Sequence, residues 1–286
     1  MSDEQIYSFA TLHNRLTVRG TLVARTALRV GAGRASGVVG NDLPVLRDAL
    51  GHPFVPGASI KGTLRARLEA LIRTVAPGQA LDLLEIEEAM RGFSTLRDDV
   101  REIREARRSG RVVEADRLFS REVWQRSTMI DLTFGAPWIA GRLFVKDALV
   151  DTQYWTNRYE VRNGVALNRD TETAEEGLLY DYEVVPAGTR FAFELVLENA
   201  ADWQLGMMLL ALKPWERGDA QIGGFRSRGL GYVQLEQVER RYTTVASADD
   251  VLRLLGIGEP ELIEEPQAAV WYAAFRNKLQ HLAQPA

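Results

Sequence analysis

Strand-like and helix-like patterns of hydrophobic residues follow one another along the chain in an order that limits the possible folds. Apolar and polar residues alternate over 15–30, which is typical of a long half-buried strand. A helix is expected to begin at Ser59 as its N-cap, because apolar residues recur at helical spacing from Ile60 to Ile72. Further strands are expected at 128–134, 142–150, 191–197 and 230–238, and a second helix at 200–213. The resulting order, strand, helix, strand, strand, strand, helix, strand, favours an α+β fold with a ferredoxin-like or RRM-like core.

Large insertions interrupt this core, and we expect residues 1–286 to form a single domain. Its parts are a core over about 14–238, a helical insertion at about 78–126, a loop at about 151–189 and a helical C-terminal extension at about 247–286 that Ser247 caps. Charged residues dominate 97–126, which predicts solvated helices broken near Ser109 and Gly110. The 151–189 segment has no good periodic run, and a loop of this length is usually functional or disordered.

Composition limits the class of protein. Of the 286 residues, 46% are hydrophobic and 26% are charged, which is typical of a globular chain. Cysteine is absent, so disulfides and thiolate zinc sites are excluded. We see no apolar run of spanning length and no signal peptide, and we expect a cytoplasmic protein without a membrane partner.

The distribution of charge indicates one cationic surface on an acidic chain. The net charge of −4 argues against a uniformly basic nucleic-acid binder. Between Gln5 and Leu68, however, the chain contains nine basic residues and only two acidic ones, Asp42 and Asp48. The basic residues are Arg15, Arg19, Arg25, Arg29, Arg34, Arg47, Lys61, Arg65 and Arg67. Genome composition explains the preference for arginine over lysine but not the shortage of acids.

The segment Ile222–Val233 is a glycine-rich loop with two arginines. It contains Gly223, Gly224, Arg226, Ser227, Arg228 and Gly229. Alternation after the loop indicates a strand, which excludes the dinucleotide fingerprint, whose glycines open a helix. A flexible backbone with two guanidinium groups suits the phosphates of RNA. The alternative is a solvated turn between two core elements.

A second candidate phosphate site lies at the start of the helix expected from Ser59. Ser59, Lys61 and Arg65 surround its first turns, and a helix N-terminus with adjacent cations can bind phosphate. The spacing of a Walker loop is absent. The alternative is an ordinary capped helix with a solvated basic face, which the motif alone favours.

Asp42 is the candidate catalytic residue. It lies in a flexible loop within the basic stretch, where a carboxylate near phosphates could hold a divalent metal or assist attack by a 2′-hydroxyl. Spacing alone favours the alternative of a turn aspartate ahead of Pro44. The histidines His13, His52 and His281 form no metal-ligand pair at helical spacing.

Aromatic residues and arginines gather in the 151–189 segment. Tyr154, Trp155 and Tyr159 accompany Arg158 and Arg162, and such residues could stack against bases. A hydrophobic patch that anchors the loop is nearly as good an explanation.

Taken together, these motifs resemble the RAMP superfamily, in particular the backbone subunit of type III CRISPR effector complexes. The resemblance rests on segments that follow one another in order over about 14–238. They are Leu22–Gly33, Asn41–Asp48, Phe54–Arg65, Leu132–Asp147 and Ile222–Tyr232. The charged 97–126 segment and the C-terminal helices exceed a minimal subunit of this family.

The resemblance implies an RRM-like core with an extended thumb, here 151–189, and several copies stacked along a CRISPR guide RNA beside other subunits of the complex. It implies that Asp42 cuts the target RNA with a divalent metal, Mg²⁺, where the thumb splays a nucleotide. The glycine loop and Ser59–Arg65 would hold guide phosphates, with Arg158 and Arg162 near the duplex. Three rivals stay open: a non-cutting scaffold, a CRISPR-RNA processing endoribonuclease of the same superfamily, and a protein that does not bind RNA.

Overall fold

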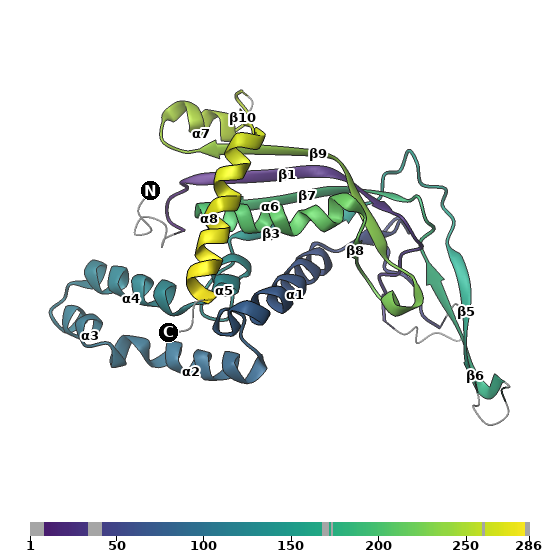
Figure 1. Cartoon of the computed structure of the whole chain (residues 1–286), viewed down its shortest axis with the longest axis horizontal. Helices are drawn as coiled ribbons and strands as arrows, with labels where there is room; N and C mark the ends of the chain where they lie inside the picture. The colour runs from purple at the N-terminus through teal and green to yellow at the C-terminus, as the bar shows by residue number, and fades with distance from the viewer. Residues whose placement is uncertain (1–8, 34–41, 168–171, 173, 259–260, 284–286) are drawn as a thin grey trace.

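The computed structural model describes residues 9–33, 42–167, 172, 174–258 and 261–283, and its centre is a six-stranded sheet (Figure 1). The strands run in the order β10-β9-β1-β7-β3, with β8 paired to β9, and all neighbours are antiparallel. Their bounds are β1 (Asn14–Ala24), β3 (Leu143–Val145), β7 (Arg190–Glu198), β8 (Ala220–Gln221), β9 (Tyr232–Thr244) and β10 (Glu261–Leu262).

Two helices connect the core strands in an interlocked way. Helix α1 (Gly57–Val75) lies between β1 and β3 in the chain, and helix α6 (Asp202–Arg217) between β7 and β9. Since β7 separates β1 from β3 and β1 separates β7 from β9, each helix links two parallel strands with one antiparallel strand between them. These are two split βαβ units, as in a ferredoxin-like fold. The α+β prediction is confirmed.

The core lies between the sheet and these helices. Every second residue of β7 from Phe191 to Leu197 is buried, because successive side chains of a strand point to opposite faces. On α1 the buried residues Ile60, Leu64, Leu68 and Ile72 recur every four positions, which places them on one helix face. The predicted strand at 191–197 and helix at 200–213 are therefore confirmed.

The opposite face of the sheet is a ladder of ion pairs. Arg15 lies opposite Glu198, with nitrogen and oxygen 2.5 Å apart, and Arg19 lies opposite Glu194 at 3.0 Å. Lys146 makes a second contact with Glu194, at 2.6 Å. The positive charges of this face are therefore matched by carboxylates from the neighbouring strand.

The C-terminal extension packs on the core. Helix α7 (Ala248–Leu254) begins at Ser247, whose side chain accepts a hydrogen bond from the backbone N–H of Asp250, so the predicted N-cap is confirmed. Helix α8 (Glu265–Ala283) crosses α6, and its Trp271 is buried with its ring 4.9 Å from that of Tyr242 (Figure 1). The crossing is close at Gly206, where a Cβ atom would lie 2.0 Å from the carbonyl oxygen of Trp271.

The helical insertion forms a layer of its own beyond α1. It contains the 3-10 turn η2 (Pro77–Gln79) and helices α2 (Leu83–Asp99), α3 (Arg101–Arg108), α4 (Val112–Arg126) and α5 (Met129–Phe134). The predicted break at Ser109 and Gly110 is confirmed, and Gly110 has a φ of 73°. Ile103, Ala106 and Ala115 form a small core between α3 and α4.

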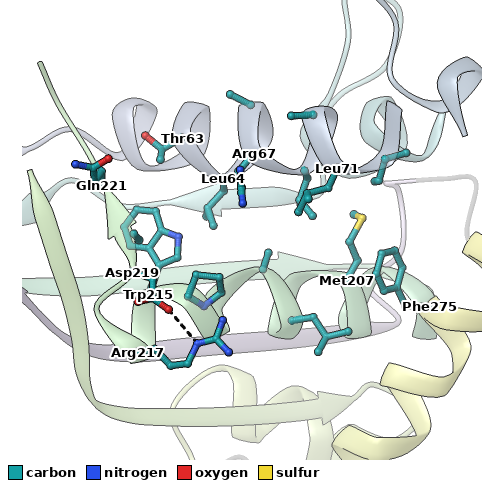
Figure 2. Close-up of a pocket in the computed structure, with 18 of the residues that line it drawn as sticks. Thr63, Leu64, Arg67, Leu71, Met207, Trp215, Arg217, Asp219, Gln221 and Phe275 are labelled. Carbon is teal, nitrogen blue, oxygen red and sulfur yellow. Dashed lines mark ion pairs between the residues drawn. The ribbon is translucent and has the colours of Figure 1, made fainter. Parts of the chain in front are cut away.

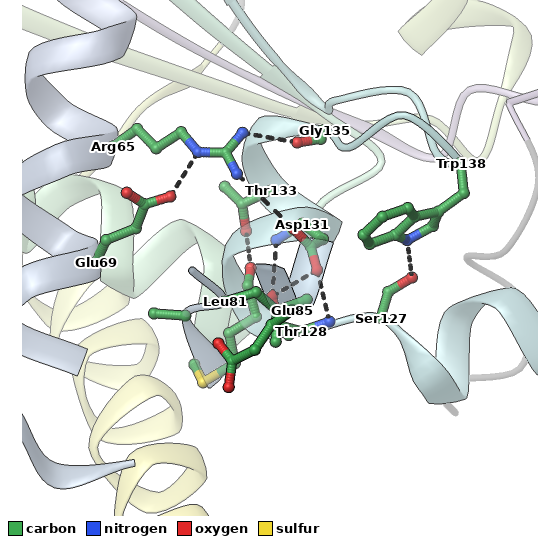
Figure 3. Close-up of polar contacts among 12 residues, drawn as sticks. Arg65, Glu69, Leu81, Glu85, Ser127, Thr128, Asp131, Thr133, Gly135 and Trp138 are labelled. Atoms are coloured by element: carbon green, nitrogen blue, oxygen red, sulfur yellow. Dashed lines mark hydrogen bonds and ion pairs between the residues drawn. The ribbon is translucent and has the colours of Figure 1, made fainter. Parts of the chain in front are cut away.

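The strand predicted at 128–134 is wrong, because this segment is helix α5. Its residues are all buried, and the apolar residues at 130, 132 and 134 alternate with the polar Asp131 and Thr133, which imitates the period of a strand. A capping box decides in favour of the helix: Thr128 and Asp131 each accept a hydrogen bond from the backbone N–H of the other (Figure 3). The strand predicted at 142–150 is divided into β3 and β4 (Ala148–Leu149).

The prediction that 151–189 lacks regular structure is also wrong. Strands β5 (Glu160–Leu167) and β6 (Ala174–Val184) form an antiparallel ribbon that projects from the sheet (Figure 1). A short pair, β2 (Phe54–Val55) with β4, lies before α1. Across the described ranges, no helix is both long and apolar enough to cross a membrane.

Substituting Gly206→Ala is expected to destabilise the fold by about 1–3 kcal/mol, because the new methyl group overlaps the backbone of α8. The matched control is Gly62→Ala on α1, where a Cβ meets nothing within 4 Å. That substitution is expected to stabilise by about 1 kcal/mol through helix propensity. Urea unfolding of both variants measures the difference, and equal stabilities would contradict the α6–α8 crossing.

Candidate nucleic-acid interface

A short segment after β1, residues 27–31, joins the elements of the candidate site; we call it the hub. Its backbone bonds to the end of β6, to the glycine loop and to the segment after Asp42. The bonds are Leu28 N to Val185 O at 2.8 Å, Val185 N to Leu28 O at 2.7 Å, Gly224 N to Arg29 O at 2.8 Å, Gly231 N to Ala27 O at 2.9 Å and Leu46 N to Val30 O at 2.8 Å. Three stretches far apart in sequence therefore converge here.

The glycine loop docks tightly on the hub. Gly223 has a φ of +83°, and a Cβ there would lie 2.2 Å from the carbonyl oxygen of Arg29, so only glycine fits. A 3-10 turn, η3 (Arg226–Arg228), forms the tip of the loop before β9, and Arg226, Ser227, Arg228 and Gly229 are exposed there. The prediction that the loop leads into a strand is confirmed.

Phe225 and Arg228 fasten the loop to the ribbon. The Phe225 ring lies edge-on to Tyr182 of β6, with centroids 4.8 Å apart. The guanidinium carbon of Arg228 lies 4.8 Å from the Phe225 ring centroid, and its Nη1 donates a hydrogen bond to the Tyr180 hydroxyl. That hydrogen bond raises the pKa of Arg228 above its ordinary value. The loop arginine is thereby held beside the base of the ribbon.

Asp42 is fixed at the same strand. Its Oδ2 accepts a hydrogen bond from the backbone N–H of Asp181 at 3.2 Å, while its side chain stays exposed. The next residue, Leu43, pairs in parallel with Tyr182 and bonds to the backbones of Asp181 and Glu183. Asp42 and Arg228 thus contact successive residues of β6, although they lie far apart in the chain.

An ion pair and a stacked ring hold this arrangement. Glu183, only 8% exposed, accepts hydrogen bonds from Arg47 at 2.6 Å and from the backbone N–H of Val45 at 3.2 Å. The Arg47 guanidinium lies 3.9 Å from the ring centroid of Tyr159, whose hydroxyl donates to the carbonyl of Gly51. Burial raises the pKa of Tyr159. The Asp42 segment is therefore tied to the ribbon at both of its strands.

The aromatic residues before the ribbon have different roles. Trp155 is 8% exposed and belongs to the core, which favours the anchoring alternative for this residue. Tyr154 is exposed, and Arg158 is exposed without a hydrogen bond or ion pair to any described residue. Arg162 pairs with Glu160 at 3.0 Å. Arg162 pairs in register with Tyr182, and Arg158 lies two residues before β5, so both are near the base of the ribbon.

The start of α1 is occupied by the protein itself. The helix begins at Gly57, so the prediction of Ser59 as its N-cap is wrong; the Gly57 N–H donates to Asp147 Oδ1 at 2.7 Å. A proline at 56 fixes the entry of the chain, which explains the earlier start. Lys61 Nζ donates to the carbonyl of Leu143 at 2.9 Å, and burial, followed by the nearby Arg65, lowers the pKa of Lys61.

Arg65 connects α1 to α5 (Figure 3). Its Nε donates to Glu69 at 2.7 Å and its Nη1 to the carbonyl of Gly135 at 2.8 Å, and Nη2 lies 3.8 Å from Asp131. Burial raises the pKa of Asp131, and hydrogen bonds from Thr128 oppose the shift. The RNA-binding role of Ser59, Lys61 and Arg65 stays a prediction, since these contacts account for the cations within the fold.

A groove of about 730 Å³ separates α1 from α6 (Figure 2). Leu64, Leu71, Met207 and Phe275 supply apolar walls, and Gln221 and Arg226 lie at one end. Arg217 near the mouth pairs with Asp219 at 3.2 Å. Its mostly apolar lining does not suit a phosphate backbone, so the polar chemistry is concentrated at the hub and the ribbon base.

The described residues hold no group of three or more His, Asp or Glu side chains that could bind a metal. Asp42 is a single exposed carboxylate. Mg²⁺ is usually bound through one or two carboxylates together with substrate phosphates and waters. The residues present therefore fit a metal ion whose ligands come partly from Asp42 and partly from the RNA, and they do not supply a complete set of protein ligands.

A model of the RAMP superfamily matches residues 21–234, and the chain belongs to that superfamily. The predicted resemblance to this superfamily is confirmed. The matched range includes the hub, Asp42, the ribbon and the glycine loop.

The chain is similar to proteins named "CRISPR system Cms endoribonuclease Csm3". One from Methanothermobacter thermautotrophicus is 26% identical over 234 residues, 78% of this chain and 84% of the relative. One from Enterococcus italicus is 24% identical over 225 residues, 78% of this chain and 90% of the relative. One from Mycobacterium tuberculosis is 40% identical over 60 residues, 20% of this chain and 25% of the relative.

Sequence reasoning missed several residues of the site. Arg29 was grouped with the other basic residues, Tyr180 and Tyr182 belonged to no motif, and Phe225 of the glycine loop had no role assigned. A signal for Arg29 was present, because it lies two residues before the glycine-rich stretch that begins at Gly31. The tyrosines alternate as in a strand, but turn-forming residues around them concealed the period.

The variant Arg65→Ala is expected to lose about 2 kcal/mol of stability, because Asp131, 2% exposed, keeps its charge while losing the nearby cation. Arg67→Ala is the matched control, since Arg67 lies on the same helix, is exposed and has no ion pair to a described residue. Chemical unfolding gives both values. Wild-type stability of Arg65→Ala together with weakened RNA binding would instead support the RNA-binding role.

Proposed function

We propose that this chain is a subunit of a type III CRISPR effector complex that binds the guide RNA and cleaves complementary target RNA with Asp42. The observation that carries the proposal is that Asp42 and Arg228 of the glycine loop contact adjacent residues of β6. Membership of the RAMP superfamily supports it, and so do the names of the relatives, which are CRISPR endoribonucleases.

Phosphate binding is assigned to the exposed arginines of the glycine loop. Arg226 and Arg228 lie on the exposed tip of the loop, and a guanidinium group can donate two parallel hydrogen bonds to phosphate oxygens. Arg158 and Arg162 extend the cationic surface along the ribbon, which we assign as the thumb. Such contacts position RNA without reading its sequence, and pairing between guide and target supplies specificity. Guide RNA, target RNA, further copies of this chain and other subunits are the proposed partners.

Cleavage is assigned to the carboxylate of Asp42. The 2′-oxygen of the nucleotide attacks the adjacent phosphorus, the bond from phosphorus to the 5′-oxygen breaks, and the 2′ proton leaves. Asp42 accepts that proton or orients the hydroxyl, and the hydrogen bond from Asp181 fixes its direction. Mg²⁺ bound by Asp42 and RNA phosphates would neutralise charge that develops on the phosphate.

A scaffold that binds RNA without cutting is the second candidate, favoured by the lack of a three-ligand metal cluster within the described residues. A guide-processing endoribonuclease would use a histidine. His13 contacts Thr11 at 2.9 Å near the start of β1, and His52 lies beside Asp48 in the loop before β2. Neither contacts the glycine loop or the ribbon, which counts against that function.

The variant Asp42→Asn tests catalysis. Asparagine keeps an oxygen for the Asp181 N–H but lacks the charge, so the loop stays attached while cleavage falls by about 10² or more. The assay is cleavage of a complementary RNA by the assembled complex in Mg²⁺, with RNA affinity measured in parallel. Asp219→Asn, an exposed carboxylate near the groove mouth, is the control. Full cleavage by Asp42→Asn would leave the scaffold as the better assignment.

Replacing Arg226 and Arg228 by alanine is expected to weaken RNA binding for every sequence and to reduce the salt dependence. Each lost contact with a single-strand phosphate lowers the slope of log affinity against log salt by about 0.7. Filter binding at several salt concentrations gives the slope. Arg217→Ala removes an exposed cation that pairs with Asp219, and it should leave the slope unchanged. An unchanged slope in the Arg226 and Arg228 variants would remove the loop from the RNA surface.

A further inference from the structure

Arg29, at the centre of the hub, is a buried cation without a counter-charge. Its side chain lies within the fold with only 9% of the residue exposed. The Nε atom is enclosed and has no hydrogen-bond partner. Among the described residues, none forms an ion pair or a hydrogen bond with its guanidinium.

The surroundings of the Arg29 guanidinium are aromatic rings and bare backbone. The Phe225 ring centroid lies 4.9 Å from its central carbon. A Cβ atom on Gly31 or Gly224 would lie 2.9 Å or 3.4 Å from Nη1, so the guanidinium packs closely against the backbone of both glycines. The ionisable groups that act on Arg29 are the hydroxyls of Tyr180 and Tyr182, and burial lowers the pKa of Arg29.

Other buried or partly buried arginines have polar partners for their guanidinium groups, and Arg29 has none among the described residues. The fully buried Arg142, for example, donates to the carbonyl oxygen of Asn199. Arg47 has Glu183 at 2.6 Å and Arg65 has Glu69 at 2.7 Å. Arginine does not deprotonate in proteins, so Arg29 keeps its charge and its desolvation cost. A buried charge that lacks a protein counter-ion is explained when a bound ligand supplies the anion.

We propose that Arg29 binds a phosphate group of the RNA backbone in the space between the glycine loop and the base of β6. The proposal rests on the proposed function and adds a second phosphate contact to it. Arg226 and Arg228 meet the RNA at the exposed tip of the loop, and Arg29 holds one phosphate beneath it. Gly31 and Gly224 carry no side chain that would shield the guanidinium from the phosphate, whose negative charge compensates the buried cation.

The variant Arg29→Met separates this role from a structural one. Methionine fills similar space without charge, so the RNA-free protein should melt about 2 °C or more higher. RNA affinity should fall about ten- to hundredfold, and the salt slope should decrease by about 0.7. The matched control is Arg19→Met on the ion-paired sheet face, which should leave RNA affinity unchanged.

The measurements are thermal melting without ligand, with inorganic phosphate and with a labelled single-stranded RNA, together with RNA titrations at several salt concentrations. The proposal is supported if RNA raises the melting temperature of the wild type but not that of Arg29→Met. Stabilisation of the wild type by phosphate alone to the same extent overturns it in favour of a free-anion site. A lower melting temperature of RNA-free Arg29→Met overturns it in favour of a structural role.

Two further results keep the two proposals distinguishable. If wild type and Arg29→Met bind RNA equally well, the role of Arg29 is overturned and the proposed function stands. If the wild type in its complex binds no RNA, both are overturned. If Arg29→Met does not fold, Arg29→Lys takes its place. Lysine keeps the positive charge but lacks the planar guanidinium that donates two hydrogen bonds to a phosphate. The slope of log affinity against log salt should therefore stay unchanged while the RNA affinity falls. Wild-type affinity of Arg29→Lys would contradict the proposal.

Discussion

The backbone hydrogen bonds of the hub, residues 27–31, are the constraint on which the candidate site depends. Strand β1 ends at Ala24, and the chain that follows is shared between three elements. The end of β6 bonds to Leu28, the glycine loop bonds to Arg29 and the segment after Asp42 bonds to Val30. The hub thus holds the glycine loop and the Asp42 segment against β6, and the contacts of Leu43 and Phe225 with Tyr182 complete the arrangement.

The charge distribution separates two surfaces of the same fold. On the open face of the sheet, arginines and lysine are matched by carboxylates on neighbouring strands, as in the pairs Arg15–Glu198 and Arg19–Glu194. Around the hub and the ribbon, Arg29, Arg158 and Arg226 have no ion pair with any described residue. Although the chain has a net charge of −4, several arginines without a paired carboxylate therefore gather at the hub and the base of the ribbon. This contrast supports an RNA surface at the loop and ribbon, and not on the sheet as in an RRM.

The sequence predicted the core well because its elements carry clear periods. Alternation over 191–197 and the four-residue spacing from Ile60 to Ile72 specify which face is buried, and the fold follows from their order. The 128–134 segment was predicted wrongly because its apolar residues alternate with polar ones as in a strand, and the Thr128–Asp131 capping box that favours a helix is a short signal.

Individual residues of the site could be predicted from the sequence, but their positions relative to one another in the fold could not. The glycine loop stands out by composition, and Asp42 gained weight only through the family resemblance. That Asp42 and Arg228 meet at β6 depends on a parallel bridge at Leu43 and a hydrogen bond to Tyr180, and long-range contacts of this kind leave no local pattern. The same reason explains why the absence of a counter-ion at Arg29 could be recognised only in three dimensions.

The central claim is that RNA lies on the glycine loop and the ribbon base. Ultraviolet crosslinking of the assembled complex to its RNA, followed by mass spectrometry of the crosslinked peptides, tests it directly. The account predicts crosslinks at Phe225, Tyr180 and Tyr182, whose rings lie beside the proposed phosphate path. Crosslinks confined to the open sheet face, for instance at the exposed Phe144 of β3, would contradict it.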